Sequence, residues 1–339
     1  MDGALQMGLT PAHLEEMKIS ILVPIYGVAA YIKECLTSLF EQTYENLEYV
    51  FVDDCSPDDS IDILQRLLNH YPKRQQQVRI IHHEHNRGLG AARATALQAA
   101  TGDFVMVVDS DDVLPLNAVT TLWQKQQETK ADMVDGAYCR LLPEGLTSPN
   151  LPYHGTKEQM LRLMLMQNVI SHQLWGRLVR RSVYTDNDIN SIEGINLAED
   201  YAVTPRLLYC SKRAYTDQVV YHYRMNTQST FADNLARRHI ESFLRANGTV
   251  CQFFKAHDTK GYYRRALHIG MIRVYHAALQ VGIPSGEIAQ VTGHRLAAWQ
   301  NPLCSHSLSP LLRLLYLMEK RFYALVQDLH FGCFHQKEI

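Results

Sequence analysis

A cluster of carboxylates in the first third of the chain has the composition of a metal site. Asp109, Asp111 and Asp112 directly follow the apolar run at 104–108. Several like charges this close together repel one another unless a cation lies among them. An Asp-x-Asp pair supplies hard oxygen ligands and leaves room for water and a substrate phosphate, as Mg²⁺ and Mn²⁺ prefer. The sequence therefore predicts a divalent metal at Asp109 and Asp111; the alternative is that these acids solvate a loop and cap a helix.

The elements that position these acids alternate between apolar strands and helices. Strands are predicted for the β-rich runs 19–25, 47–54, 78–83 and 103–112. Apolar residues at helical spacing predict helices at 32–40 and 61–68, and a run of small residues predicts another at 88–100. Strands that are continuously apolar indicate a parallel sheet covered on both faces, so the predicted fold class is α/β. Ligands of such a sheet gather at the carboxyl ends of its strands.

The composition is that of an ordinary globular protein. The chain has 339 residues, of which 46% are hydrophobic and 20% charged, and its formal net charge is -2. This charge balance does not indicate the basic surface that binding of nucleic acid requires. Seven scattered cysteines without a C-x-x-C pair indicate free thiols in a reducing compartment. The first residues lack the pattern of a secretory signal, and no apolar run is long enough to span a bilayer. We therefore expect a cytoplasmic protein without a nucleic-acid partner.

The alternation weakens near Tyr153, and a mainly helical region is predicted from Asn234 onward. Its helical stretches are 237–257, 262–280, 286–299 and 310–329. The last stretch is apolar around most of its circumference, with basic residues interspersed. It is interpreted as a core or oligomer helix, and the alternative is a helix lying at a membrane surface, which would place the protein peripherally at the inner face of the membrane.

Three motifs in the first third of the chain resemble the nucleotide-binding half of the family 2 glycosyltransferases. They are VPIYGVAAYIKECLTSLFEQTYENLEYVFVDDCSPDDS, HNRGLGAARATAL and TGDFVMVVDSDD, in the order and spacing of that family. The resemblance continues less tightly through QLWGRLVRRSVY, LAEDYAVTPRLL and VVYHYRMNTQSTF, and it lapses beyond Asn234. It implies a GT-A type fold, in which a Rossmann-like, mostly parallel sheet has flanking helices, and a nucleotide-sugar donor, which we expect to be a UDP-sugar.

The resemblance also implies a division of the chain. Residues 1–18 would be an N-terminal extension, 19–233 a catalytic domain and 234–339 the helical region. Within the catalytic domain, 19–114 would bind the nucleotide sugar and 115–233 the acceptor. The acceptor would be a glycan or a lipid-linked glycan, as expected for the synthesis of a polysaccharide or glycoconjugate.

Donor-site roles carry over to matching positions. Pro24 and Tyr26 would line the site of the base and ribose. Asp54, with Asp53 beside it, would accept a hydrogen bond from the nucleobase, and Arg93 would lie against the nucleotide. These roles place the nucleoside at the ends of the first two strands.

The diphosphate is expected at the carboxylate cluster. Asp109 would face the ribose or a metal-bound water, and Asp111 would ligate the Mg²⁺ or Mn²⁺ that binds the donor diphosphate. Tyr223, Arg224 and Ser229 match a segment that closes over the diphosphate in the family, and Arg suits bidentate phosphate contact. The alternative for this segment is a surface hairpin with an aromatic stripe.

The acceptor hydroxyl requires a base, and the resemblance assigns this role to Asp200, with Glu199 as the alternative. An acid pair that caps a helix is the other interpretation. A carboxylate of ordinary pKa can serve, because the hydroxyl becomes acidic only as it attacks. One base without a second paired nucleophile indicates single displacement, hence inversion. Gly176 and Arg177 depart from the family's common Asn-Lys pair, which leaves the acceptor open.

Other functions are also compatible with parts of the sequence. GLGAAR at 88–93 follows a strand and opens a helix, as in dinucleotide-binding enzymes, but its third glycine position holds Arg93 and residues 83–87 separate it from the strand. HHEHN at 82–86 is interpreted as a polar loop rather than a metal cluster. A nucleotidyltransferase would need a glycine-rich triphosphate loop directly after the first strand, and this sequence has none there. A nucleotide-sugar-binding module without activity would lack the base, whereas Asp200 is present.

Overall fold

A computed structural model describes residues 17–166, 170, 172–225, 237–280, 283 and 285–292. These residues form two compact units whose segments interleave along the chain. The first unit contains the described residues up to His154, Gln173–Gly194 and the stretch that begins at Cys210. The second contains Gly155–His172, Ile195–Tyr209 and the described residues after 236. The boundary at 233 that we expected from the resemblance stays a prediction.

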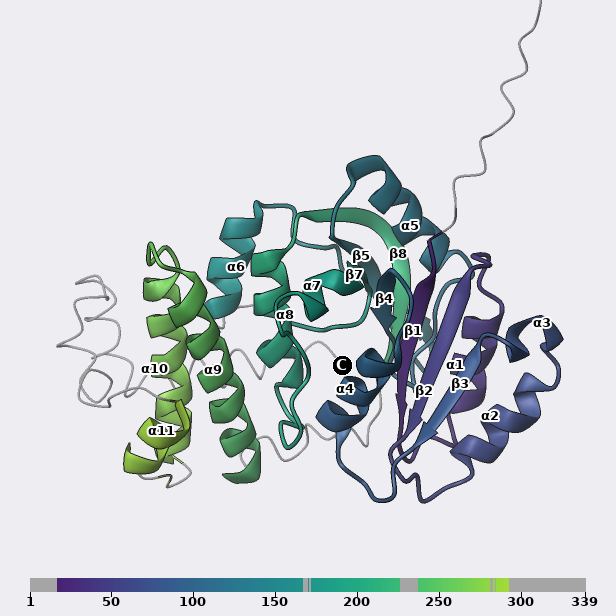
Figure 1. Cartoon of the computed structure of the whole chain (residues 1–339), viewed down its shortest axis with the longest axis horizontal. Helices are drawn as coiled ribbons and strands as arrows, with labels where there is room; N and C mark the ends of the chain where they lie inside the picture. The colour runs from purple at the N-terminus through teal and green to yellow at the C-terminus, as the bar shows by residue number, and fades with distance from the viewer. Residues whose placement is uncertain are drawn as a thin grey trace, which may run out of the picture. The chain divides into compact units, whose positions relative to one another are not determined.

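The first unit is built on an eight-stranded sheet (Figure 1). The strands follow the order β3-β2-β1-β4-β7-β5-β6, and β8 pairs with β5. β1, β2, β3 and β4 are parallel to their neighbours in this set, β7 is antiparallel to β4 and β5, and β8 is parallel to β5. The strand bounds are β1 Ile19–Ile25, β2 Leu47–Asp53, β3 Val78–His82, β4 Phe104–Val107, β5 Met133–Leu142, β6 Gly145–Leu146, β7 Arg177–Arg180 and β8 Arg213–Arg224.

The predicted α/β class is confirmed, because helices cover both faces of the parallel strands. Every residue of β1 is buried. Its alternate residues Ile19, Ile21 and Val23 pack with α1, whereas α4 contacts β1 and β2 through the other face. The helices of this unit are α1 Ile32–Phe40, α2 Ser60–Leu68, α3 Pro72–Gln75, α4 Leu89–Ala99, α5 Ala118–Thr129 and α7 Arg181–Thr185.

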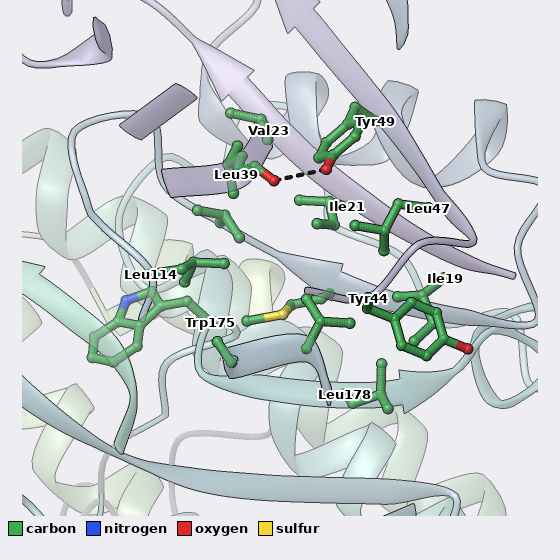
Figure 2. Packing of buried hydrophobic residues seen from close by; sticks show 14 of the residues in the cluster. Ile19, Ile21, Val23, Leu39, Tyr44, Leu47, Tyr49, Leu114, Trp175 and Leu178 are labelled. Atoms are coloured by element: carbon green, nitrogen blue, oxygen red, sulfur yellow. Dashed lines mark hydrogen bonds between the residues drawn. The ribbon is translucent and has the colours of Figure 1, made fainter. Parts of the chain in front are cut away.

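The core of the first unit lies between α1, α5 and the sheet (Figure 2). Aliphatic side chains from β1 meet Leu39 of α1 and Leu178 of β7 in this core. Tyr49 is fully buried, and its hydroxyl donates to the carbonyl of Leu39 at 2.7 Å, so that its polar atom is satisfied. This packing fixes the strand ends from which the candidate site is built.

The second unit is helical. Its helices are α6 Lys157–Leu165, α8 Glu199–Cys210, of which the second unit holds all but the last residue, α9 Arg237–His257, α10 Arg264–Gln280 and α11 Ser285–Thr292. Their core includes Ile240, Leu244, Met271, Ile272 and Ile288. The predicted helix at 237–257 is confirmed with the same bounds, and the one at 262–280 begins two residues later than predicted. The predicted helix at 286–299 is found as α11 as far as Thr292, and its remainder and the helix at 310–329 lie outside the described residues. Among the helices that are described, none has the length and hydropathy to cross a membrane.

Candidate functional site

The site is centred on the turn that follows β4. Val108 continues the strand by donating its N–H to the carbonyl of Leu22 at 3.0 Å, and the chain then turns, with the Asp112 N–H donating to the Asp109 carbonyl at 3.1 Å. Asp109 keeps 24% of its side chain exposed, Asp111 is half-buried and Asp112 is fully buried. Two carboxylates therefore face outward and one faces the protein.

Arg93 fixes one side of this turn. The residue lies in α4, and its guanidinium Nη2 donates to Asp109 Oδ1 at 2.7 Å while only 3% of the arginine side chain is exposed. A charge-assisted bond of this length is among the stronger hydrogen bonds in proteins. The structure thus brings together two residues predicted for the donor site, and it places Arg93 behind Asp109.

The end of β8 fixes the other side. The Tyr221 hydroxyl donates to Asp112 Oδ2 at 2.7 Å and accepts from the Asp109 N–H at 3.1 Å. The Arg224 N–H donates to Asp112 Oδ1 at 2.7 Å, and its side-chain Nε donates to the Asp111 carbonyl at 2.8 Å. β8 therefore holds all three carboxylate residues of the turn, although it lies more than a hundred residues further along the chain.

The guanidinium of Arg224 lies at the border of the turn. It donates through Nη2 to the exposed carboxylate of Glu34 in α1 and lies over the ring of Tyr31, 5.3 Å from its centroid. The side chain is held at one end by the turn and at the other by an exposed acid. Its positive charge is therefore positioned beside Asp111, and its contact with a diphosphate stays a prediction.

The outward acids of the turn act electrostatically on the buried one. Burial, and after it the charges of Asp109 and Asp111, raise the pKa of Asp112 to about 8, while the hydrogen bonds from Arg224 and Tyr221 lower it in part. Within the part of the chain that the structure describes, no group of three or more His, Cys, Asp or Glu side chains is arranged to hold a metal ion. Asp109 and Asp111 fit a smaller set of ligands, in which two carboxylates bind an ion and water and substrate phosphate supply its other ligands. This is the arrangement that Mg²⁺ favours.

An aromatic stack supports the turn from β8. Trp175 stacks on Tyr221 with centroids 4.4 Å apart and on Tyr223 with centroids 5.2 Å apart. Burial and the charges of the turn raise the pKa of Tyr223 to about 12. The predicted residue Tyr223 thus lies in the same stack as the tyrosine that holds Asp112, two residues further along β8.

The residues after Trp175 have structural roles that the sequence did not reveal. Gly176 adopts a φ of 70°, in the left-handed region that favours glycine. Arg177 is buried, with Nε 3.4 Å from Asp135 Oδ1, and Arg213 donates to Asp135 Oδ2 at 2.6 Å. Arg177 therefore belongs to an ion-pair cluster inside the sheet.

The loops after β1 and β2 form the neighbouring edge of the site. Tyr26 directly follows β1 with 51% of its surface exposed, whereas Pro24 is buried within the strand. The next residues are held by the second loop: the Gly27 N–H donates to Ser56 Oγ at 2.9 Å and the Ala29 N–H to Asp58 Oδ2 at 2.8 Å. Tyr26 is thus an exposed aromatic ring on an anchored loop.

The carboxylate of Asp54 accepts hydrogen bonds from the backbone of its own chain. It is 3% exposed, its Oδ1 accepts from the Arg87 N–H at 2.9 Å and its Oδ2 from the Gly88 N–H at 2.7 Å. His83 Nδ1 lies 2.6 Å from the same Oδ1. These bonds organise the loop that leads into α4 and presents Arg93. His83 comes from the HHEHN stretch, so one histidine of this polar loop is a buried support of Asp54.

Asp53 is the less buried acid of the pair. Its Oδ1 accepts from the Ser56 N–H at 2.8 Å and its Oδ2 lies 2.9 Å from His82 Nδ1, while 13% of its side chain remains exposed. The nucleobase role that we assigned to Asp54 and Asp53 stays a prediction, and the geometry favours Asp53 because it retains an exposed edge.

The predicted base belongs to the other compact unit. Glu199 and Asp200 occupy the first turn of α8, where Glu199 is buried and Asp200 half-buried. Each of the two residues is engaged in an interaction, so neither side chain is free. Ser229 lies outside the described residues, so its predicted contact with the diphosphate is not addressed by the structure.

Comparison with known proteins agrees with this geometry. Residues 20–185 match the model of Glycosyl transferase family 2. Glycosyltransferase GlyG of Streptococcus pneumoniae serotype 4 is 38% identical over 120 residues, which are 35% of this chain and 38% of GlyG. The chain thus aligns with little more than a third of the length of that relative.

Solved structures share the fold. TarS 1-349 of S. aureus in complex with UDP has a TM-score of 0.62 and 21% identity, covering 84% of this chain and 83% of that chain. Mannosyltransferase PcManGT from Pyrobaculum calidifontis, in complex with GDP-Man and Mn2+, has a TM-score of 0.51 and 17% identity over 93% of this chain and 88% of that chain. Together with the matched motifs and the GT-A type sheet, the family match shows a family 2 glycosyltransferase domain over residues 20–185.

Proposed function

We propose that this chain transfers a sugar from a nucleotide-sugar donor, specifically a UDP-sugar, to a hydroxyl of a glycan or lipid-linked acceptor. The observation that carries the proposal is the turn after β4, which presents two outward carboxylates, Asp109 and Asp111, between two arginines. This combination of acids and guanidinium groups suits a diphosphate that binds together with a divalent cation. The binding of UDP by TarS and of Mn2+ by PcManGT supports the choice of donor and metal.

Asp109 and Asp111 would hold Mg²⁺ or Mn²⁺ at the turn. The ion would act as a Lewis acid that neutralises the charge developing on the departing diphosphate. Arg93 acts through Asp109, because it is buried and donates to that carboxylate. Arg224 supplies a second positive charge to the diphosphate once its guanidinium leaves Glu34.

The nucleoside is assigned to the ends of β1 and β2. Tyr26 offers an exposed ring for the base or ribose, and Pro24 is buried in β1 two residues before it. Asp53 would accept from the nucleobase, while Asp54 keeps the neighbouring loop in place.

The chemical step needs a proton acceptor. Asp200 would remove the proton of the acceptor hydroxyl as the oxygen attacks the anomeric carbon and the bond to the diphosphate breaks. Glu199 is the alternative base. With one base and direct attack, the sugar carbon inverts its configuration.

A panel of UDP- and GDP-sugars tests the proposal. We expect hydrolysis or transfer of at least one donor in the presence of Mn²⁺ and its loss in EDTA. Asp200→Asn should slow turnover about 10² to 10⁴-fold, which is what a general base supplies, with UDP affinity unchanged. The control Asp62→Asn removes an exposed acid on α2 and should behave as wild type. Metal-independent turnover, or normal turnover in both Asp200→Asn and Glu199→Gln, contradicts the mechanism.

A further inference from the structure

The backbone immediately before the predicted base is strained. Ala198 adopts a φ of 62°, in the left-handed region that residues with a Cβ avoid. Glu199 and Asp200 follow it in the first turn of α8. Strain of this kind persists only where the surroundings impose it, and it is found where a side chain must be aimed. The direction in which the two acids leave the loop is therefore set at Ala198.

The restraint that imposes this conformation comes from α9. The Leu197 N–H donates to Ser242 Oγ at 3.1 Å, and the same hydroxyl donates to the Leu197 carbonyl at 2.8 Å. A single side chain thus satisfies both backbone polar groups of the residue before Ala198. On the other side, the Ala202 N–H donates to the Ala198 carbonyl at 3.1 Å and closes the first turn of α8. Ala198 is held between these two fixed points.

Ser242 is itself rigidly placed. The residue is 8% exposed, and Ile240 and Leu244 of the same helix belong to the core of the second unit. Phe243 lies against Tyr201 of α8, with ring centroids 6.3 Å apart. The start of α8 is thus anchored to α9 by a hydroxyl clamp and an aromatic contact.

The other side of α8 is held within the same unit. The ring of Tyr201 meets His172 edge to face, with centroids 5.0 Å apart, and Thr204 Oγ1 donates to the His172 carbonyl at 2.6 Å. Rotation of α8 about its axis would break these contacts. The remaining freedom of Asp200 relative to its own unit therefore depends on the loop that ends at Ala198.

We propose that Ser242 is a positioning residue for the base, and that α9 is the support that aims Asp200 and Glu199 through the strained backbone at Ala198. The inference rests on the proposed function, because it assumes that one of these acids accepts the acceptor proton. It assigns a task in the chemical step to a helix beyond Asn234, where the motifs of the nucleotide site have ended. Ser242 touches neither donor nor acceptor in this scheme.

The test compares Ser242→Ala with Thr249→Ala, which removes a hydroxyl on the same helix that donates to the Arg245 carbonyl. The assay uses the full chain, UDP with Mn²⁺ for binding, and the fastest UDP-sugar of the panel for turnover. We expect kcat of Ser242→Ala to fall about 10- to 100-fold, as displacement of a reacting group does, with UDP affinity unchanged. Thr249→Ala should match wild type. A normal kcat in Ser242→Ala, or a loss of UDP affinity equal to the loss of kcat, overturns the proposal.

A second variant keeps the test independent of the stability of Ser242→Ala. Ala198→Gly relieves the left-handed strain, so the chain should melt no lower than wild type. Because glycine also frees the backbone that aims the acids, kcat should fall. The double variant Ser242→Ala with Asp200→Asn separates this inference from the proposed function: with the base absent, removing Ser242 should cause no further loss. Equal fold losses in both backgrounds overturn the positioning role, whereas normal turnover in Asp200→Asn and Glu199→Gln overturns the proposed base itself.

Discussion

Asp112 has the least ordinary environment of the acids in the turn after β4. It is fully buried, accepts hydrogen bonds from Tyr221 and Arg224, and has a pKa raised to about 8 by burial and by Asp109 and Asp111. The acids expected at the metal were predicted from the Asp-x-Asp spacing alone. The task of Asp112 was not, because it depends on a tyrosine more than a hundred residues away. The alternation of Tyr221 and Tyr223 was the local sequence signal that these two rings share one face of a strand.

The raised pKa predicts how stability depends on pH in the metal-free chain. Between the ordinary value of 3.8 and about 8, the folded chain keeps the Asp112 proton that the unfolded chain has lost. The unfolded state then binds fewer protons, so the free energy of unfolding falls as pH rises through this window. Asp112→Asn should flatten this decline. Melting temperatures in EDTA at several pH values, with Asp62→Asn as control, check it; parallel curves for Asp112→Asn and wild type contradict it.

Tyr221 links two acids of the turn, which makes its hydroxyl separable from its ring. Tyr221→Phe keeps the stack on Trp175 but leaves Asp112 Oδ2 and the Asp109 N–H without this partner. We expect a loss of about 1–3 kcal/mol in the free energy of unfolding, the cost of an unsatisfied buried polar group. We also expect weaker Mn²⁺-dependent UDP binding, because the turn loses a restraint.

Tyr49→Phe is the matched control for this change. Its buried hydroxyl donates to the Leu39 carbonyl in the core (Figure 2). Denaturant unfolding of both variants should show comparable losses, and calorimetric titration with UDP and Mn²⁺ should show weaker binding in Tyr221→Phe alone. Equal UDP affinities in the two variants would mean that the hydroxyl serves stability only.

The strands of the parallel half were predictable because each is a continuous apolar run. β1 has the predicted bounds, and β2 and β3 each end one residue early. β4 covers only 104–107 of the strand predicted at 103–112, because the acids that follow it form a turn. The other half was not predicted: β7 inserts antiparallel between β4 and β5, and β8 pairs with β5 in parallel. These pairings join segments far apart in the sequence, and hydrophobic periodicity carries no information about which strands pair. The register that brings Tyr221 and Arg224 to the turn is therefore a property of the folded sheet.

Gly136 tests the contribution of the β5–β8 pairing. A Cβ at this position would clash with the side chain of Val220. Gly136→Ala should therefore cost about 1–3 kcal/mol, as overpacking of a core does, and weaken UDP binding by shifting β8. Gly136→Ala combined with Val220→Ala should recover part of both losses. Chemical denaturation and UDP titration of the single and double variants decide the matter; a double variant as unstable as the sum of the single ones would exclude this steric coupling.

The two compact units divide the proposed tasks. Every strand of the described residues belongs to the first unit, and so do the residues assigned to the nucleotide and metal, with Ser229 outside the described residues. The predicted base lies in the second unit with α9 to α11. The sequence indicated a helical region beyond Asn234, but the motif order did not indicate that α8 packs with it. The contact between Ser242 and Leu197 joins two residues that no sequence motif relates, so only the folded structure shows it.

Calorimetric titration of Asp111→Asn with UDP in the presence of Mn²⁺ tests whether the turn after β4 binds the donor diphosphate through a metal. Wild type and Asp62→Asn should bind UDP with Mn²⁺ and lose most of this affinity in EDTA. Asp111→Asn should bind UDP weakly and equally in Mn²⁺ and in EDTA, because one metal ligand is removed while the nucleoside contacts of β1 and β2 remain. Mn²⁺-dependent affinity in Asp111→Asn equal to that of wild type would contradict the assignment.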